Sequence, residues 1–109
     1  MKYIRQIITI WIGLDSEITL PLLVDGEQPT GITRAVFKFD NFCLDSNVDA
    51  EITVVEDPNE TYVYMIPGHI PNLVEGEYVG YLTIYDAEAP NGLPWGDPII
   101  VKVGTWPTC

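Results

Sequence analysis

The sequence predicts an all-β protein that folds as an antiparallel β-sandwich, and two observations support this fold class. The chain of 109 residues consists of short runs rich in Val, Ile, Thr, Tyr and Phe, separated by clusters of Gly, Pro, Asn and Asp. It contains no convincing helical period of apolar residues. Because a chain of this length supports one compact core, we expect a single domain spanning residues 1–109.

Seven runs are expected to form strands, and turn residues between them mark where the chain reverses. Residues 1–13 form an N-terminal strand or arm in this prediction, and residues 104–109 form a C-terminal tail. Turns are expected at 25–26, 57–59 and 91–92. The expected strands are Lys2–Ile12, Glu17–Val24, Thr33–Phe39, Glu51–Val55, Thr61–Ile66, Tyr78–Asp86 and Ile99–Val103.

Two of these strands alternate clearly between two faces. Because successive side chains of a strand point in opposite directions, each is expected to turn one apolar face toward a core. In the third strand, Ala35, Phe37 and Phe39 share one face, and Arg34, Val36 and Lys38 share the other. In the sixth, Val79, Tyr81, Thr83 and Tyr85 oppose Tyr78, Leu82 and Ile84.

The segment Leu73–Tyr78 makes the prediction more specific. A leucine, a glycine and a tyrosine at the start of a strand are typical of a tyrosine corner, in which the phenol hydroxyl bonds to upstream backbone. The alternative is that Gly76 serves only the turn and Tyr78 only the strand. About seven short strands with this feature predict an immunoglobulin-like sandwich.

Composition restricts the classes of partner. Five Lys and Arg residues against sixteen Asp and Glu residues give a formal net charge of −11. Such a chain repels polyanions, so neither nucleic acid nor a membrane surface is an expected partner. The chain has two cysteines, Cys43 and Cys109, and a secreted domain held together by disulfides usually carries more. Reduced thiols are therefore favoured over a bridge between them.

The first strand has two interpretations. A secretory signal peptide begins with basic residues ahead of an apolar run, and here Lys2 and Arg5 precede such a run. However, Thr9 interrupts the run, Asp15 ends it, and no small-residue cleavage site follows. The run is also shorter than the ~20 apolar residues that span a bilayer. We therefore expect a β-strand, and no secretion by a signal peptide.

This strand is expected to be apolar on both faces. Ile8, Ile10 and Ile12 alternate with Ile7, Thr9 and Trp11. Apolar residues on both faces imply burial on both faces, and in so small a domain the second cover is expected to come from another subunit. Ile8, Ile10, Trp11 and Ile12 are therefore interface candidates.

Two further tryptophans are interface candidates. Trp95 lies in the expected loop Ala87–Pro98, and Trp106 lies in the C-terminal tail. Tryptophans flanked by Pro and Gly are good anchors for a partner when exposed. The alternative is that each folds back and caps one end of the sandwich.

The stretch 45–56, DSNVDAEITVVE, resembles the template of a calcium-binding loop. Against this, Ala50 stands where the template has Gly, and Glu51–Val55 is an expected strand. An extended strand would carry Glu56 roughly 17 Å from Glu51, too far to share one cation. We expect a polar turn and no metal or cofactor, with a loop calcium site on Asp45, Asn47 and Asp49 as the weaker alternative.

The sequence does not predict an enzyme. His69 is the only histidine, and Cys43–His69 is the only thiol pairing available, so His69 is expected to be a loop histidine with a structural or incidental role. No phosphate-binding loop or nucleophile elbow occurs, and a small sandwich seldom holds a cleft deep enough for a pair of catalytic carboxylates. No catalytic residue is therefore expected.

Three segments carry a resemblance to a known class of protein. They are the stretch 30–39, TGITRAVFKF, the stretch 72–86, NLVEGEYVGYLTIYD, and the closing PIIVKV. Together they resemble small immunoglobulin-like domains of tailed-phage virions, such as the N-terminal domain of phage baseplate upper proteins and accessory head and tail proteins. The likeness spans most of residues 17–103 and carries no catalytic residue.

The resemblance implies a non-enzymatic virion component that is assembled in the cytoplasm of an infected bacterium. It would bind copies of itself and a major capsid or tail protein, as a capsid decoration (cement) protein or as a tail or baseplate component. The alternative is a carbohydrate-binding or adhesin-type module that uses Trp95, with or without a calcium loop.

Overall fold

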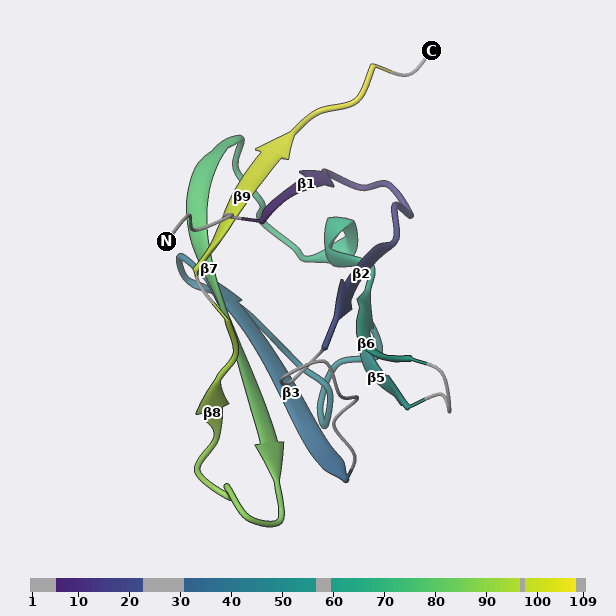
Figure 1. Ribbon diagram of the computed structural model, residues 1–109. Helices are drawn as coiled ribbons and strands as arrows, with labels where there is room; N and C mark the ends of the chain where they lie inside the picture. The colour runs from purple at the N-terminus through teal and green to yellow at the C-terminus, as the bar shows by residue number, and fades with distance from the viewer. Residues whose placement is uncertain (1–5, 23–30, 57–59, 97, 108–109) are drawn as a thin grey trace.

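The computed structural model describes residues 6–22, 31–56, 60–96 and 98–107, and it confirms the all-β sandwich (Figure 1). Its described part holds nine strands and one short 3₁₀ helix, η1. The elements are β1 (Ile7–Trp11), β2 (Ile18–Pro21), β3 (Ile32–Phe39), β4 (Phe42–Asp45), β5 (Ile52–Glu56), β6 (Thr61–Met65), η1 (Pro67–His69), β7 (Gly76–Asp86), β8 (Leu93–Pro94) and β9 (Ile99–Gly104).

The strands form two sheets that pack face to face (Figure 1). The larger sheet has the order β1-β9-β7-β3-β4, and β8 pairs with β7 beyond the end of β9. The smaller sheet has the order β2-β6-β5. This arrangement matches the immunoglobulin scheme, in which strands B, E and D form one sheet and G, F, C and C′ the other.

The tyrosine corner is present at the start of β7. The hydroxyl of Tyr78 donates a hydrogen bond of 2.7 Å to the carbonyl oxygen of Val74. Gly76 lies against the same ring, since a Cβ built there would be 3.2 Å from the Tyr78 hydroxyl. Both residues therefore serve the corner, and the immunoglobulin-like prediction is confirmed by strand order and by this bond.

The structure corrects the prediction in strand number and direction. β4 and β8 were not expected, and the range Ala87–Pro98 is not one loop because β8 lies within it. β1 pairs with β9 in parallel, so the sheet is not wholly antiparallel. No hairpin joins these two strands, so no short turn imposes an antiparallel direction on them. Residues 1–5 of the expected first strand lie outside the described residues.

β4 follows β3 after a turn of two residues. Phe39 pairs directly with Phe42, and Asp40 between them has a φ of 51°. Asp tolerates this left-handed conformation better than most residues, and Asp and Asn are favoured in tight hairpins. The dipeptide Asp40-Asn41 between two phenylalanines was therefore an available sequence signal for this hairpin.

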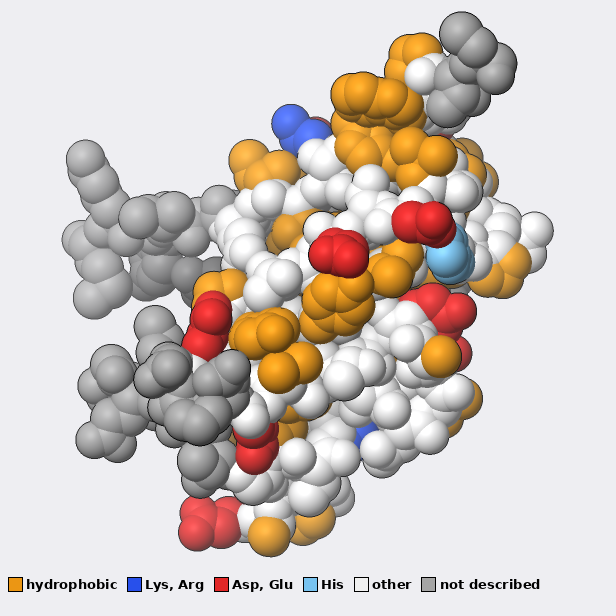
Figure 2. Space-filling model, turned by 90° about the vertical axis from the view of Figure 1, so that its right-hand side faces the viewer, with side chains coloured by type: hydrophobic (Ala, Val, Ile, Leu, Met, Phe, Trp, Pro, Cys, Tyr) orange, Lys and Arg blue, Asp and Glu red, His pale blue; other side chains and the backbone are white. Residues whose placement is uncertain are grey.

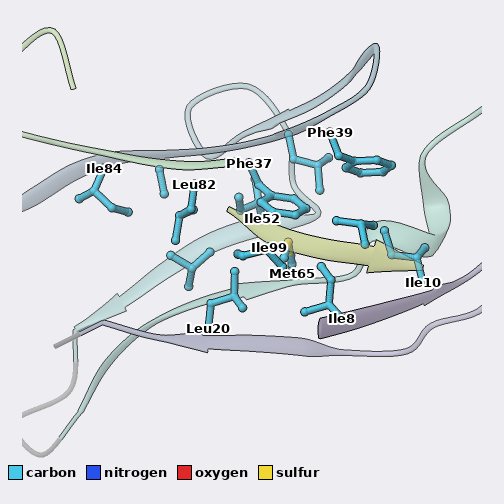
Figure 3. Close-up of a cluster of buried hydrophobic side chains, with 14 of the residues drawn as sticks. Ile8, Ile10, Leu20, Phe37, Phe39, Ile52, Met65, Leu82, Ile84 and Ile99 are labelled. Atoms are coloured by element: carbon cyan, nitrogen blue, oxygen red, sulfur yellow. The ribbon is translucent and has the colours of Figure 1, made fainter. Parts of the chain in front are cut away.

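The core lies between the two sheets (Figure 3). Phe37 and Phe39 of β3 project from the larger sheet toward Leu20 of β2 and Met65 of β6 in the smaller one. The buried hydrophobic residues are Ile8, Ile10, Leu20, Leu22, Ala35, Phe37, Phe39, Leu44, Ile52, Val63, Met65, Leu82, Ile84, Ile99, Val101 and Val103.

Phe37 and Gly80 together occupy the centre of the larger sheet's inner side. In antibody domains a tryptophan of strand C packs on a disulfide whose second cysteine lies two residues after the corner tyrosine. Gly80 holds that position here, after Tyr78, and Phe37 lies on the strand that corresponds to C. A Cβ built on Gly80 would lie 2.7 Å from the Phe37 ring. The phenyl ring therefore takes the space that a side chain at position 80 would need.

Candidate interaction surface

The inward side of β1 belongs to the core. Ile8 and Ile10 are buried among the chain's own side chains, and Ile12 is partly buried against the same cluster. The expectation that Ile8 and Ile10 are presented to another subunit is therefore wrong as stated. Strand alternation gives the physical reason, because the side of β1 that faces the smaller sheet is already covered by this chain.

The outward side of the larger sheet faces away from the smaller sheet, and its side chains are exposed or half-buried. Its members are identified by strand register and by alternation with buried neighbours. We call this surface the outer face. It consists of Ile7, Thr9, Trp11, Arg34, Val36, Lys38, Cys43, Asp45, Glu77, Val79, Tyr81, Thr83, Tyr85, Ile100 and Lys102.

An apolar row crosses the middle of the outer face. Ile7 pairs with Ile100, which in turn pairs with Val79, so one row runs across β1, β9 and β7. Tyr81 follows Val79 on the same side of β7. The exposed fractions of Ile7, Val79 and Tyr81 are 55%, 46% and 55%. Neighbouring exposed apolar side chains on one sheet surface are typical of a protein-binding site.

Arg34 and Asp45 form an ion pair across β3 and β4. The Arg34 Nε donates to the Asp45 Oδ1 at 2.9 Å, and its Nη2 donates to the Oδ2. These bonds from the guanidinium hold the pKa of the Asp45 carboxyl below its ordinary value and raise the pKa of Arg34. The guanidinium also lies 4.8 Å from the centre of the Tyr85 ring. Arg34 thus has an ion-pair partner and a ring contact within the chain.

The basic residues of the described chain are concentrated on the outer face. Arg34, Lys38 and Lys102 are the only Lys and Arg residues within the described ranges, and all three point outward from the larger sheet. Asp45 and Glu77 are the carboxylates among the outer-face residues, and Glu77 lies directly opposite Lys102. The outer face is therefore nearly neutral although the chain carries a net charge of −11.

The opposite side of the molecule differs in charge. Figure 2 turns the smaller sheet toward the viewer and shows several acidic side chains with very little blue. There Glu17 accepts a hydrogen bond from Tyr64 and raises the pKa of that phenol. Acidic side chains on this side repel a second copy that approaches with the same side.

A tryptophan pair marks the edge of the outer face beside β1. The rings of Trp11 and Trp106 lie 5.1 Å apart in an edge-to-face arrangement with an interplanar angle of 74°. Trp11 lies over Gly104, since a Cβ there would be 3.0 Å from its ring. Trp106 remains 53% exposed. The structure thus brings together two of the predicted interface residues from opposite ends of the sequence.

Trp95 lies away from this pair, between β8 and β9. Its backbone N–H donates to the carbonyl oxygen of Leu82 at 2.9 Å, and its ring packs partly against the core. Two hollows of about 290 Å³ each border it, and both are lined by Leu82, Trp95 and Gly96. Tyr81 lines the second hollow, so this hollow adjoins the outer face. Trp95 is therefore half buried, as the capping alternative expected.

Asp45, Asn47 and Asp49 form a hydrogen-bonded turn between β4 and β5. Asp45 Oδ1 accepts from the backbone N–H of Asn47 at 3.0 Å, and Asp49 Oδ2 accepts from the backbone N–H of Asp45 at 2.9 Å. The Asp45 carboxylate is also held by Arg34. These contacts direct the carboxylates to the chain's own donors rather than to one cation.

Cys43 and His69 line one hollow of about 200 Å³ together with the acidic residues Asp49 and Glu51. His69 in η1 pairs with Asp15, and Cys43 is an exposed thiol on β4. Within the described ranges, no three His, Cys, Asp or Glu side chains come together as a possible metal site. The same ranges contain no helix with the length and apolar character needed to cross a membrane.

Comparison of the chain with protein-family models, curated proteins and solved structures finds no match. The candidate surface therefore rests on the geometry alone. Its central residues Val79 and Tyr81 were not among the predicted interface residues. The alternation of the expected strand Tyr78–Asp86 places both residues on the face opposite Leu82 and Ile84, and this shared face was the signal that was available.

Proposed function

We propose that this chain is a non-enzymatic structural subunit that binds other proteins through its outer face. The observation that carries this proposal is the exposed apolar surface of Ile7 and Val79, which lie in one row across the larger sheet, and of Tyr81, which follows Val79 on β7. Burying such side chains against a partner removes apolar area from water. This burial stabilises the complex by about 25 cal/mol per Å² of apolar area.

The design of the fold supports this use. The inner face of the same strands is closed by a packed core, so the outer face is held rigid without contributing its own side chains to that core. Tyr81 offers a broad apolar surface with one hydroxyl, the kind of anchor that is enriched in interfaces. The Trp11–Trp106 pair extends the surface toward the β1 edge.

We further propose that the assembly is the particle of a tailed phage, with the chain as a head decoration, tail or baseplate component. Its support is the likeness of the stretches 30–39 and 72–86 to immunoglobulin-like virion domains, together with the tyrosine corner at Tyr78. Partners in this proposal are other copies of the chain and a major capsid or tail protein. A carbohydrate-binding module is less well supported, because Trp95 is half buried and Arg34 holds Asp45.

The test compares two variants that introduce the same charge at two exposed valines. Val79→Glu places a carboxylate in the apolar row, whereas Val48→Glu places one in a turn at a residue that is 79% exposed. Particles purified on a density gradient are probed for bound protein. Wild type and Val48→Glu are expected on the particles, and Val79→Glu is expected to remain unbound.

Two results would overturn the proposal. One is that none of the three proteins is found on particles, which removes the virion assignment. The other is that Val79→Glu binds as well as wild type, which removes the outer face as the contact. A thermal shift on addition of calcium would instead favour the metal-dependent binding module.

A further inference from the structure

The outer face combines apolar and charged residues in a way that suits one particular partner. The charged residues of both signs flank the apolar row, with Lys102 and Glu77 on one side of it and Lys38 on the other. Arg34 is satisfied by Asp45. A strongly acidic partner would meet few free cations here, and a strongly basic one few free carboxylates.

A polyanion is an especially poor fit. Binding to phosphates gains strength from several unpaired Lys and Arg side chains that release counterions. On the outer face Arg34 is engaged by Asp45, so Lys38 and Lys102 remain as its cations, and Glu77 lies opposite Lys102 in the strand register. The surface that fits is itself apolar, nearly neutral and of mixed charge.

We infer that the partner of the outer face is a second copy of the same face, so that two chains pack their larger sheets against each other about a two-fold axis. This inference rests on the proposed role of the outer face as an interaction surface. An identical face supplies the apolar row and both signs of charge that the first one requires. The arrangement also keeps the acidic sides of the two copies on the outside of the dimer, where repulsion between them is weakest.

The size of the face sets how much of it must take part. The five strands contain 5, 6, 11, 8 and 4 residues, and at about 3.3 Å per residue and about 4.8 Å between strands they give a projected area on the order of 500 Å². A standard stable interface buries about 800 Å² of accessible surface on each partner. Side chains that project from the sheet make its accessible area larger than its projected area. A stable dimer therefore requires the whole face, including Trp11.

The experiment is sedimentation of the full chain over a series of concentrations from micromolar to millimolar. Wild type and Val48→Glu are expected to convert from monomer to dimer with similar dissociation constants. Val79→Glu is expected to raise the dissociation constant at least about tenfold, because the symmetric interface buries the substituted side chain twice. Urea unfolding of each variant checks that all three are equally folded.

A second measurement reads the contact directly. Cys43 is an exposed thiol on the outer face. In a Cys109→Ser background its alkylation is expected to slow as wild type dimerises, and to stay fast in Val79→Glu. A chain that is monomeric throughout the series, or a dimer that Val79→Glu and Val48→Glu leave equally intact, would overturn the inference. A monomeric wild type that binds particles only when Val79 is intact would leave the proposed function standing.

Discussion

The two faces of the larger sheet are made by the same strands and have opposite properties. On the inner face Phe37, Phe39 and Val101 are almost completely buried. On the outer face Val79 and Tyr81 remain about half exposed, one residue away along the chain from buried neighbours. The difference shows that strand alternation separates stability from recognition, so that changes to one face are expected to leave the other largely intact.

The largest expected effect comes from emptying the inner face. Phe37→Ala removes a ring from the centre of the core and is expected to cost about 3–5 kcal/mol of unfolding free energy. The matched control on the outer face is Tyr81→Ala, which is expected to cost no more than about 1 kcal/mol. Urea unfolding followed by tryptophan fluorescence measures both. Similar losses from the two substitutions would contradict the division between the faces.

A smaller effect is expected from filling the inner face. Gly80→Ala adds a methyl group 2.7 Å from the Phe37 ring and 2.9 Å from Val101, and overpacking of this kind costs about 1–3 kcal/mol. In a Phe37→Ala background the ring is gone, so the same change is expected to cost less. A double-mutant cycle measures the difference as a coupling energy.

Additive costs in that cycle would mean that Gly80 is required for a reason other than the Phe37 ring. A matched control is Gly96→Ala, where a Cβ meets no atom within 4 Å. Its cost comes only from the positive φ of 66° and is expected to be unaffected by Phe37→Ala.

The inner face was largely accessible from sequence, because the alternation of Ala35, Phe37 and Phe39 specifies which side is buried. The tyrosine corner was accessible for a similar reason, since its residues are neighbours in the chain. The parallel pairing of β1 with β9 was not, because it joins segments that no local pattern relates. The outer face was missed in part, since Val79 and Tyr81 form a surface only when Ile7 is placed beside them across β9.

The tyrosine corner joins the inner side of β7 to the loop before it, and its bond is expected to contribute an intermediate amount. Tyr78→Phe keeps the ring and removes the hydroxyl that donates to Val74. A loss of about 0.5–1.5 kcal/mol is expected, the usual net value of one hydrogen bond. Urea unfolding measures it, with Tyr81→Phe, on the outer side of the same strand, as the control. An equal loss in the control would contradict a specific role for the corner.

The smallest expected effect lies on the outer face, in the Arg34–Asp45 pair. Arg34 lowers the pKa of Asp45 in the folded chain, so the pair stabilises the fold above the ordinary carboxyl pKa of about 3.9 and loses this contribution as pH falls through the lowered value. Because both side chains retain contact with solvent, screening keeps the effect small. Asp45→Asn should therefore be slightly less stable than wild type in urea unfolding at neutral pH and equal to it in strong acid. The control is Glu88→Gln, which removes the same charge at an exposed residue and should not show a stability difference from wild type that disappears in acid. If Asp45→Asn stays less stable than wild type in acid, the hydrogen bonds of Asp45 to the turn, rather than its charge, stabilise the fold.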